Sequence, residues 1–243
     1  MSRPYVLSIA GLDPSGGAGI LADIKTIEAL HVQGFGVATS LTYQNENAFL
    51  GLHWISLERI IAQLKPLITF YPISVVKIGL IESPTVLQGI LNYLKENLPT
   101  ARIVWDPILR ASAGFDFHQG GIESFKELLS AIEIITPNWK ELSAANSDAM
   151  ENAIQLSRYC KVVLKGGHSD EERANDYLIT QGQLQSFSLP RLEATSKHGT
   201  GCMFSSAIAA NLALGETVEE SVRKAKSFVF ERLQSQEGGL ASF

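Results

Sequence analysis

The sequence lacks most of the features that mark membrane-bound, secreted or nucleic-acid-binding proteins. Its 243 residues include only 2 cysteines, Cys160 and Cys202, too few for the disulfide framework of a small secreted domain. The charge-free stretch Gly199–Gly215 contains polar residues and is shorter than the roughly 20 apolar residues of a membrane span. The formal net charge is −5 and Lys and Arg are scattered singly, which disfavours nucleic acid and anionic lipid as partners. We therefore expect a cytoplasmic protein, without a readable N-terminal signal, that binds neither membrane nor nucleic acid.

The composition is that of a folded globular chain. Hydrophobic residues make up 45% and aromatic residues 8% of the sequence, which excludes a mainly disordered, collagen-like or coiled-coil chain. No internal repeat and no Pro/Ser-rich linker divides it, so we expect one domain over residues 1–243. Short apolar runs that are typical of buried strands recur at Tyr5–Ala10, Phe35–Thr42, Ile73–Gly79, Arg102–Asp106, Glu133–Thr136 and Lys161–Lys165.

Helical patterns lie between these runs. Apolar residues recur at a spacing of about 3.6 from Ile20 to Leu30 and again from Val86 to Leu94. Strands that lack a polar face and alternate with helices favour a parallel sheet that is covered by helices on both faces. Residues 176–180 and 184–189 flank a Gly-containing turn and are typical of an antiparallel hairpin. The predicted fold class is therefore α/β, with a mostly parallel central sheet and an antiparallel edge hairpin.

A glycine-rich segment follows the first predicted strand. Ala10–Gly19 carries four glycines, and ligands of open α/β sheets bind outside the carboxyl ends of the strands. Its spacing matches neither a dinucleotide fingerprint nor a phosphate loop. A tight connection from strand to helix is the alternative explanation of the glycines. Asp23, about one turn into the helix, could direct its carboxylate towards the same mouth or lie on the surface.

A second glycine-rich segment, His198–Cys202, precedes an uncharged predicted helix. The backbone amides of Gly199, Thr200 and Gly201 at a helix N-terminus can bind an anion, and a transferring phosphoryl group is the natural occupant. Cys202 would lie in the first turn, where the pKa of a thiol can be lowered from about 8.5. The alternative role for Cys202 is that of a small buried hydrophobic residue, which is what we expect of Cys160.

Polar residues also follow later predicted strands. Asn138 and Glu141 form an Asn-x-x-Glu capping pair, and Glu141 is in addition a candidate ligand of a hydrated Mg²⁺ ion, which binds through one or two carboxylates plus substrate phosphates. Asp106, at the end of a strand, is the second candidate. The segment Lys165-Gly166-Gly167-His168 follows another strand, where its glycines could admit a nucleotide base or a phosphate or could simply form a turn.

Taken together, these segments resemble the ribokinase-like superfamily, and within it the hydroxymethylpyrimidine/phosphomethylpyrimidine kinases of thiamine biosynthesis. The similarity extends over almost the whole chain. Its most specific segments are Asp13-Pro14-Ser15-Gly16-Gly17-Ala18-Gly19, Ala22-Asp23-Ile24-Lys25-Thr26, Gln44-Asn45, Lys77-Ile78-Gly79, Asp106-Pro107, Thr136-Pro137-Asn138 with Glu141, Lys165-Gly166-Gly167-His168 and His198-Gly199-Thr200-Gly201-Cys202.

The resemblance implies an αβα sandwich, a homodimer, and transfer of the ATP γ-phosphate to the hydroxymethyl group of a small-molecule pyrimidine. The implied cofactors are ATP as phosphoryl donor and Mg²⁺, and a role for a monovalent cation is left open. Substrate contacts are implied for Gln44, Asp23, Gly11 and Leu80. The Gln44 amide would read the aminopyrimidine ring, because it offers both a donor and an acceptor.

The resemblance also assigns the phosphate end of the site. The segment Gly199–Cys202 would surround the moving phosphoryl group. Because phosphoryl transfer passes through a loose transition state, Cys202 could suffice to accept the hydroxyl proton or to orient the hydroxyl. The implied nucleotide contacts are Lys165, Gly166, Gly167 and Asn138, and the implied magnesium contacts are Glu141 and Asp106.

Two other functions remain open from the sequence. A pyridoxal kinase on the same template would also act on a flat heteroaromatic ring with a hydroxymethyl group, and the Gln44-Asn45 pair argues for the pyrimidine instead. A non-catalytic domain that binds a pyrimidine or nucleotide and reports it to a partner is the second alternative. The anion-binding segment, Glu141 and Asp106 argue against a sensor, because a sensor needs no groups for phosphoryl transfer.

Overall fold

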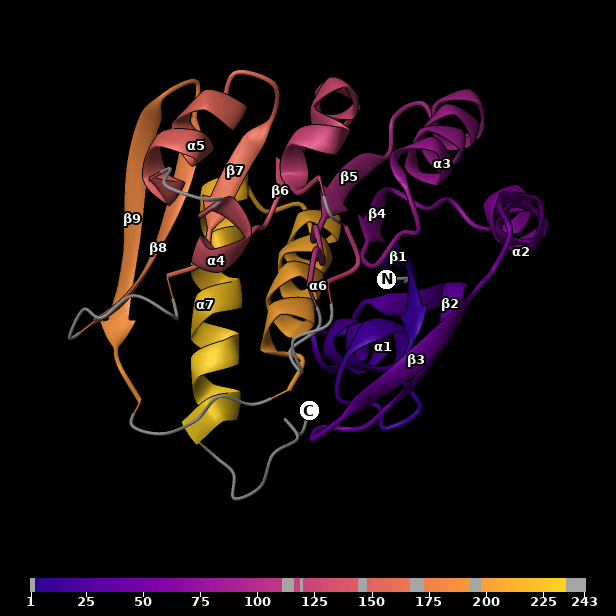
Figure 1. Cartoon of the computed structure of the whole chain (residues 1–243), viewed down its shortest axis with the longest axis horizontal. Coiled ribbons are helices and arrows are strands. Elements are labelled where there is room, and N and C mark those ends of the chain that lie inside the picture. The colour runs from indigo at the N-terminus through magenta and orange to yellow at the C-terminus, as the bar shows by residue number, and fades with distance from the viewer. Residues whose placement is uncertain are drawn as a thin grey trace.

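The computed structural model describes residues 3–110, 116–118, 120–143, 148–166, 173–192 and 198–234. Its strands form one nine-stranded sheet in the order β3-β2-β1-β4-β5-β6-β7-β8-β9 (Figure 1). The strands are β1 Tyr5–Leu12, β2 Gln33–Gln44, β3 Phe49–Trp54, β4 Val75–Ile78, β5 Arg102–Trp105, β6 Ile134–Ile135, β7 Lys161–Leu164, β8 Arg173–Thr180 and β9 Gln183–Pro190. The helices are α1 Gly19–Ala29, α2 Leu57–Phe70, α3 Pro84–Asn97, the 3₁₀ helix η1 Ile122–Ala131, α4 Trp139–Leu142, α5 Ala149–Leu156, α6 Thr200–Ala213 and α7 Val218–Gln234.

The centre of the sheet is parallel and both of its edges are antiparallel. β1 pairs in parallel with β2 and β4, and parallel pairing continues through β5, β6 and β7. β8 and β9 form the predicted hairpin, which extends the sheet from β7. The predicted fold class, including the antiparallel edge hairpin, is confirmed.

The opposite edge of the sheet carries a hairpin that the sequence analysis did not predict. β2 continues to Gln44, and β3 pairs antiparallel with it. The Asn45 side chain accepts hydrogen bonds from the backbone N–H groups of Asn47 and Ala48, each at 2.9 Å. Such a side-chain turn reverses the chain without glycine, which is why the usual hairpin signal is missing here.

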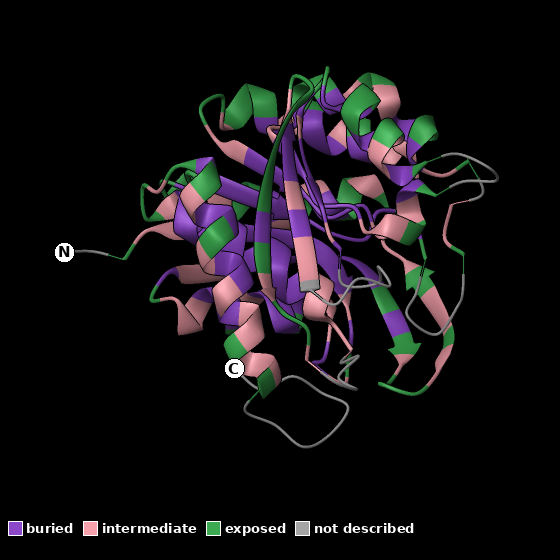
Figure 2. Cartoon of the chain, turned by 90° about the vertical axis from the view of Figure 1, so that its left-hand side faces the viewer, coloured by how far each residue is buried: buried purple, intermediate pink, exposed green. Residues whose placement is uncertain are grey.

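Alternate residues of the central strands face opposite layers of helices. In β1, Val6 packs in a cluster with residues of α1, α6 and α7, whereas Leu7 packs in a cluster with residues of α2, α3, η1 and α5. Helices accordingly cover both faces of the sheet (Figure 1), and the buried residues gather in the strands and on the inner sides of the helices (Figure 2). This period-two burial on both faces explains the continuous apolar runs of the sequence.

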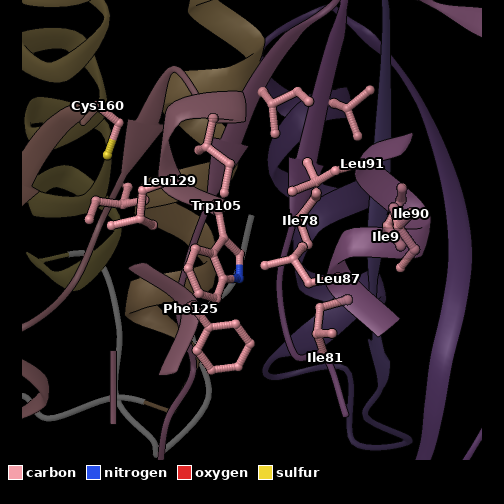
Figure 3. Close-up of a cluster of buried hydrophobic side chains, with 14 of the residues drawn as sticks. Ile9, Ile78, Ile81, Leu87, Ile90, Leu91, Trp105, Phe125, Leu129 and Cys160 are labelled. Carbon is pink, nitrogen blue, oxygen red and sulfur yellow. The ribbon is translucent and has the colours of Figure 1, made fainter. Parts of the chain in front are cut away.

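Large side chains fill the cluster on the α3 side of the sheet (Figure 3). The rings of Trp105 and Phe125 lie 5.0 Å apart between centroids. Cys160 lies in the same cluster, and burial raises the pKa of its thiol to about 12. The prediction that Cys160 is a packed residue is confirmed. None of the helices in the described part of the chain is long and apolar enough to cross a membrane.

Candidate active site

The carboxyl ends of the parallel strands open into a cavity of about 1040 Å³. The segments that follow β1, β2, β4, β5, β6 and β7 reach this edge of the sheet, together with the N-terminus of α6. Parallel strands all end on the same side, so motifs that are far apart in the sequence come together there. The cavity is lined by most of the predicted site residues: Gly11, Gln44, Leu80, Asp106, Asn138, Glu141, Lys165, Gly199, Thr200, Gly201 and Cys202.

The first glycine loop, Asp13–Gly19, is organised around a buried carboxylate. Asp13 accepts hydrogen bonds from the backbone N–H groups of Ser15 and Ala18, each at 2.9 Å. Gly19 has a φ of +59°, and a Cβ at this position would lie 2.2 Å from the carbonyl oxygen of Gly11. The chain can therefore fold back onto β1 before α1 begins only with glycine here.

The second glycine segment, His198–Cys202, is called the anion loop below. Helix α6 begins at Thr200, and its N-cap residue Gly199 has a φ of +83° and provides no side-chain cap. A Cβ on Gly199 would lie 1.7 Å from the carbonyl oxygen of Gly17, so the two glycine loops are in direct contact. The first N–H groups of α6 lack a side-chain cap at the cavity wall, an arrangement that favours binding of an anion.

A buried ion pair lies beside the anion loop. Lys165 Nζ donates a hydrogen bond to Asp106 Oδ1 at 2.8 Å, and Thr136 Oγ1 donates to the same oxygen at 3.0 Å. A Cβ added to Gly201 would lie 3.2 Å from Lys165 Nζ, so the amine borders the loop. Burial raises the pKa of Asp106, but the charges of Lys165 and Lys77 and the hydrogen bonds from Lys165 and Thr136 together outweigh burial and hold this pKa below its usual value. A fixed cation next to uncapped amides is suited to stabilising a phosphoryl group.

Glu141 forms the predicted capping box with Asn138. The Asn138 side chain accepts from the backbone N–H of Glu141, and the Glu141 carboxylate accepts from the backbone N–H of Asn138 at 2.7 Å. Burial raises the pKa of Glu141 to about 7, with Lys165 the main opposing charge. Glu141 therefore caps helix α4, which confirms the capping role that the Asn-x-x-Glu spacing predicted.

Two carboxylates on the cavity wall, those of Glu141 and Asp106, are candidate contacts of a magnesium ion. Within the described residues, no group of three or more His, Cys, Asp or Glu side chains is arranged to hold a metal ion. A hydrated Mg²⁺ ion needs only one or two carboxylates and takes its other ligands from water and phosphate oxygens. Glu141 and Asp106 both line the cavity and fit that requirement.

Asp23 lies behind the cavity and is not among the residues that line it, so the structure does not bring it to the predicted substrate contact. Its fully buried carboxylate accepts hydrogen bonds from Lys77 Nζ at 2.8 and 2.9 Å, from Ser8 Oγ at 2.6 Å and from Ser206 Oγ at 2.7 Å. α1 turns this residue towards the sheet, where a charged side chain requires a buried partner. Asp23 therefore joins α1 to β1, β4 and α6.

Cys202 lines the cavity, but its thiol does not have the lowered pKa that a position in the first turn of a helix can give. Burial raises the pKa of the Cys202 thiol to about 12, and the charge of Lys77 opposes this only in part. Desolvation therefore outweighs the effect of the helix N-terminus. A thiol that stays protonated at neutral pH can orient a substrate hydroxyl, but it cannot take the proton as a thiolate.

We expect Cys202→Ala to lower kcat by less than about 100-fold, because removal of a true general base typically costs about 100-fold or more. Steady-state ADP release measures this loss. Cys202→Ser is the matched control, since its hydroxyl can replace the orienting contact. The pH profile of kcat should keep its shape in Cys202→Ser from about pH 6 to pH 9, a range in which the thiol does not ionise. A larger loss together with disappearance of an alkaline limb would instead identify a thiolate base.

Gly166 and Gly167, two of the predicted nucleotide contacts, are not among the described residues that line the cavity. The backbone N–H of Gly166 donates to Asp176 Oδ1 at 2.9 Å, and a Cβ on Gly166 would lie 1.7 Å from the carbonyl oxygen of Asn175. Close packing against β8 therefore explains this glycine, and Gly166 does not line the cavity. Gly167, like His168, lies outside the described residues.

The structure adds cavity residues that the sequence analysis did not indicate. Phe49 is the cross-strand partner of Gln44, and its ring packs edge to face on Phe117 with centroids 5.4 Å apart. Lys226 of α7 pairs with Asp176 of β8 at 2.7 Å. All of these side chains line the cavity. Phe49 lies in β3, Asp176 in β8 and Lys226 in α7, and Phe117 lies in the segment between β5 and η1. These four segments reach the site only through tertiary packing.

A family model described as phosphomethylpyrimidine kinase matches residues 13–239. The chain belongs to this family. A hydroxymethylpyrimidine/phosphomethylpyrimidine kinase of Staphylococcus aureus is 32% identical to it, with a match that covers 96% of this chain and 90% of the relative. The predicted family resemblance is confirmed.

Solved structures share the fold over nearly the whole chain. A phosphomethylpyrimidine kinase from Clostridium difficile is 31% identical, with a TM-score of 0.78 and coverage of 94% of this chain and 99% of that one. A pyridoxal kinase from Bacillus subtilis, solved as an ADP complex, is 27% identical, with a TM-score of 0.85 and coverage of 98% and 94%. Kinases for two different ring substrates therefore share this architecture, so the fold alone does not distinguish between those substrates.

Proposed function

We propose that this chain uses ATP to phosphorylate the hydroxymethyl group of 4-amino-5-hydroxymethyl-2-methylpyrimidine, and then the resulting monophosphate, in thiamine biosynthesis. Family membership supports the reaction class. The observation that carries the proposal is the cavity itself, in which the uncapped start of α6 and the Lys165–Asp106 pair face the same space as Gln44. Holding donor and acceptor in one cavity is what transfer between two bound molecules requires.

The substrate end of the cavity is suited to a flat, polar ring. Gly11 and Leu80 provide a close-packed wall, because a Cβ on Gly11 would lie only 3.4 Å from Leu80 Cδ2. Gln44 and Phe49 are neighbours across the β2–β3 pair and supply an amide and an aromatic face. We propose that the Gln44 amide pairs with the donor and acceptor of the aminopyrimidine edge.

The phosphate end of the cavity is suited to charge stabilisation. We propose that the N–H groups of Gly199–Cys202 hold the moving phosphoryl group and that Lys165 and Asn138 contact the nucleotide. Mg²⁺, held through Glu141 and Asp106, would neutralise phosphate charge. A loose transition state gains most from this kind of positioning and charge stabilisation, so a strong base is not required.

Product analysis with ATP and the hydroxymethylpyrimidine tests the proposal. The purified chain should release ADP only when the pyrimidine is present, and mass spectrometry should detect the monophosphate followed by the diphosphate. Absence of pyrimidine-dependent ADP release would contradict the proposed function. Stabilisation of the protein by the pyrimidine in a thermal shift assay without ADP release would favour the sensor instead.

Pyridoxal kinase activity is the second candidate function. The observation that favours it is the likeness to the Bacillus subtilis pyridoxal kinase, at a TM-score of 0.85. Pyridoxal also presents a hydroxymethyl group on a flat ring. A higher kcat/KM for pyridoxal than for the pyrimidine would make it the better substrate and overturn the proposed choice.

We expect Gln44→Glu to raise the KM for the pyrimidine roughly 10- to 100-fold, with a smaller effect on kcat. The carboxylate introduced by Gln44→Glu could not donate a hydrogen bond, so the acceptor atom of the ring would stay unpaired and would lie next to a carboxylate oxygen. We expect this to weaken the binding free energy of the pyrimidine by roughly 1–3 kcal/mol. Gln185→Glu on exposed β9 is the matched control for the added charge and should leave KM unchanged. Equal KM values in Gln44→Glu and Gln185→Glu would show that Gln44 does not contact the substrate.

We further propose that the chain acts as a cytoplasmic homodimer. The β2–β3 hairpin supports self-association, since three of its apolar side chains, Leu41, Tyr43 and Leu50, are 41%, 54% and 83% exposed. Apolar side chains grouped in this way commonly mark contact surfaces. Light scattering on the eluting protein checks the subunit number, and a monomeric mass at micromolar concentration would contradict the dimer.

A further inference from the structure

A histidine–aspartate contact joins the two glycine loops of the site. His198 Nε2 lies 2.9 Å from Asp13 Oδ2, although the two residues are 185 positions apart in the sequence. Their side chains are only 9% and 1% exposed. His198 is the first residue of the anion loop, and Asp13 is the first residue of the first glycine loop. The contact therefore connects the opening residues of both loops.

The Asp13 carboxylate is held in one orientation by its own loop. Ser15 donates to it from both its backbone N–H, at 2.9 Å, and its hydroxyl, at 2.8 Å, and Ala18 donates from its backbone N–H at 2.9 Å. Burial raises the pKa of Asp13, but hydrogen bonds from His198, Ser15 and Ala18 outweigh burial and lower it. An ionised carboxylate can only accept, so His198 Nε2 carries the hydrogen and donates it.

The imidazole of His198 depends on this bond for its orientation. The other ring nitrogen, Nδ1, is buried and has no hydrogen-bond partner within the described chain. The ring also lines the cavity. Asp13 is consequently the group that fixes where the His198 ring, and the anion loop attached to it, come to lie.

Backbone contacts show how little freedom the two loops have relative to one another. Gly199 packs so tightly against Gly17 that a Cβ would lie 1.7 Å from the carbonyl oxygen of Gly17. The backbone of Gly19 also lies close enough to Cys202 to lower the pKa of its thiol against the larger effect of burial. A shift of one loop therefore moves the α6 amides relative to Gly11 and Ala18 on the substrate side of the cavity.

We propose that Asp13 and His198 are positioning residues, which clamp the anion loop to the first glycine loop and so hold the α6 amides in register with the substrate hydroxymethyl group. The inference rests on the proposed function and adds to it a pair of residues that need not touch the reacting atoms. Misplacement of reacting groups by about 1 Å can cost roughly 100-fold in rate. Loss of the clamp should therefore lower kcat and leave substrate binding largely intact.

A series of His198 variants tests the clamp by rescue. His198→Ala removes the donor, His198→Asn provides an amide N–H that is too short to reach Asp13, and His198→Gln provides one at about the reach of Nε2. We expect kcat to fall by roughly 100-fold in the first two variants, to recover to within about tenfold in His198→Gln, and the KM for the pyrimidine to change by less than about threefold throughout. Equal kcat values in His198→Ala and His198→Gln would overturn the clamp, as would a loss that appears only in KM.

A double-mutant cycle tests whether Asp13 acts through His198. Asp13→Asn keeps the Oδ1 that accepts from Ser15, and it replaces the Oδ2 that Ala18 and His198 contact with an uncharged amide group. If the pair is one unit, Asp13→Asn combined with His198→Ala should be no slower than the slower single variant. Losses in kcat that multiply would show independent roles and would contradict the proposal.

The control is Glu133→Gln, which breaks the Arg102–Glu133 ion pair at the amino ends of β5 and β6. It should lower Tm without changing kcat, and so it separates general destabilisation from misplacement of the anion loop. If the wild-type chain fails to phosphorylate the pyrimidine, the proposed function fails. In that case the same His198 variants are measured with pyridoxal as the substrate. Recovery of kcat in His198→Gln but not in His198→Ala or His198→Asn would then support the clamp independently of the pyrimidine reaction.

Discussion

Gly199→Ala is expected to slow phosphoryl transfer by at least about 100-fold while the rest of the fold persists. Gly199 has a φ of +83°, and an added Cβ would lie 1.7 Å from the carbonyl oxygen of Gly17 and 2.7 Å from its carbonyl carbon. Neither backbone atom can move without displacing a whole loop. The left-handed conformation by itself costs a non-glycine residue about 1–2 kcal/mol.

The loss of activity should exceed the loss of stability. Moving Gly199 moves the first N–H groups of α6, and loss of one such donor typically costs roughly 100- to 1,000-fold in rate. We therefore expect kcat to fall at least about 100-fold, measured by coupled ADP release, with circular dichroism used to confirm folding.

Gly215→Ala is the matched control for Gly199→Ala. Gly215 also has a positive φ, +91°, but no atom lies within 4 Å of the position of an added Cβ. It follows the C-terminal end of α6, away from the anion loop. Gly215→Ala should lower Tm by a few degrees through backbone strain and leave kcat unchanged. If Gly199→Ala behaves like Gly215→Ala, the anion loop does not hold the phosphoryl group.

Asp23→Ala is expected to cause a large loss of stability. It leaves the Lys77 ammonium fully buried without its carboxylate. Burial alone lowers the pKa of Lys77, but the neighbouring acidic groups, with Asp23 foremost, and the hydrogen bond to Asp23 together outweigh burial and raise this pKa above its usual value. Removal of one partner from a buried ion pair typically costs about 3–5 kcal/mol. For a chain of this size we expect Tm to fall by roughly 10 °C or more, measured by calorimetry.

The combination of Asp23→Asn with Lys77→Met tests whether the pair is one unit. With both charges removed, Ser8 and Ser206 still have an amide to bond, so the double variant should lose less stability than the two single variants together. Glu123→Gln, in an exposed ion pair with Lys126, is the control and should leave Tm unchanged. Additive losses, or a small loss in Asp23→Ala, would show that the buried pair contributes little.

Most of the fold follows from local patterns in the sequence. Continuous Val- and Ile-rich runs identified the central strands because both faces of a parallel sheet are buried, and the hairpin Arg173–Pro190 was indicated by its Gly-containing turn. β3 was missed because its turn relies on the Asn45 side chain, and its residues alternate only weakly in burial. The edge of a sheet leaves a weaker sequence signal than its centre.

Much of the candidate site could also be predicted from local patterns in the sequence. Asp106, Asn138 and Lys165 stand at or directly after strand ends, which placed them at one edge of the sheet, whereas the anion loop was indicated by its glycines before a predicted helix. Phe49 and Lys226 were not predictable, since neither belongs to a motif. Packing of β3 on β2, and of α7 against β9 and α6, brings them to the cavity.

Charge state and burial were decided by the tertiary structure. The sequence by itself determined the alternation of strands and helices, the positions of both glycine loops and the family, because these depend on residue type and order along the chain. It did not determine that Asp23 faces Lys77 inside the protein, that the Cys202 thiol stays protonated, or that His198 meets Asp13. Each of these depends on desolvation and on neighbours distant in sequence, which exist only once the sheet and its helices have packed.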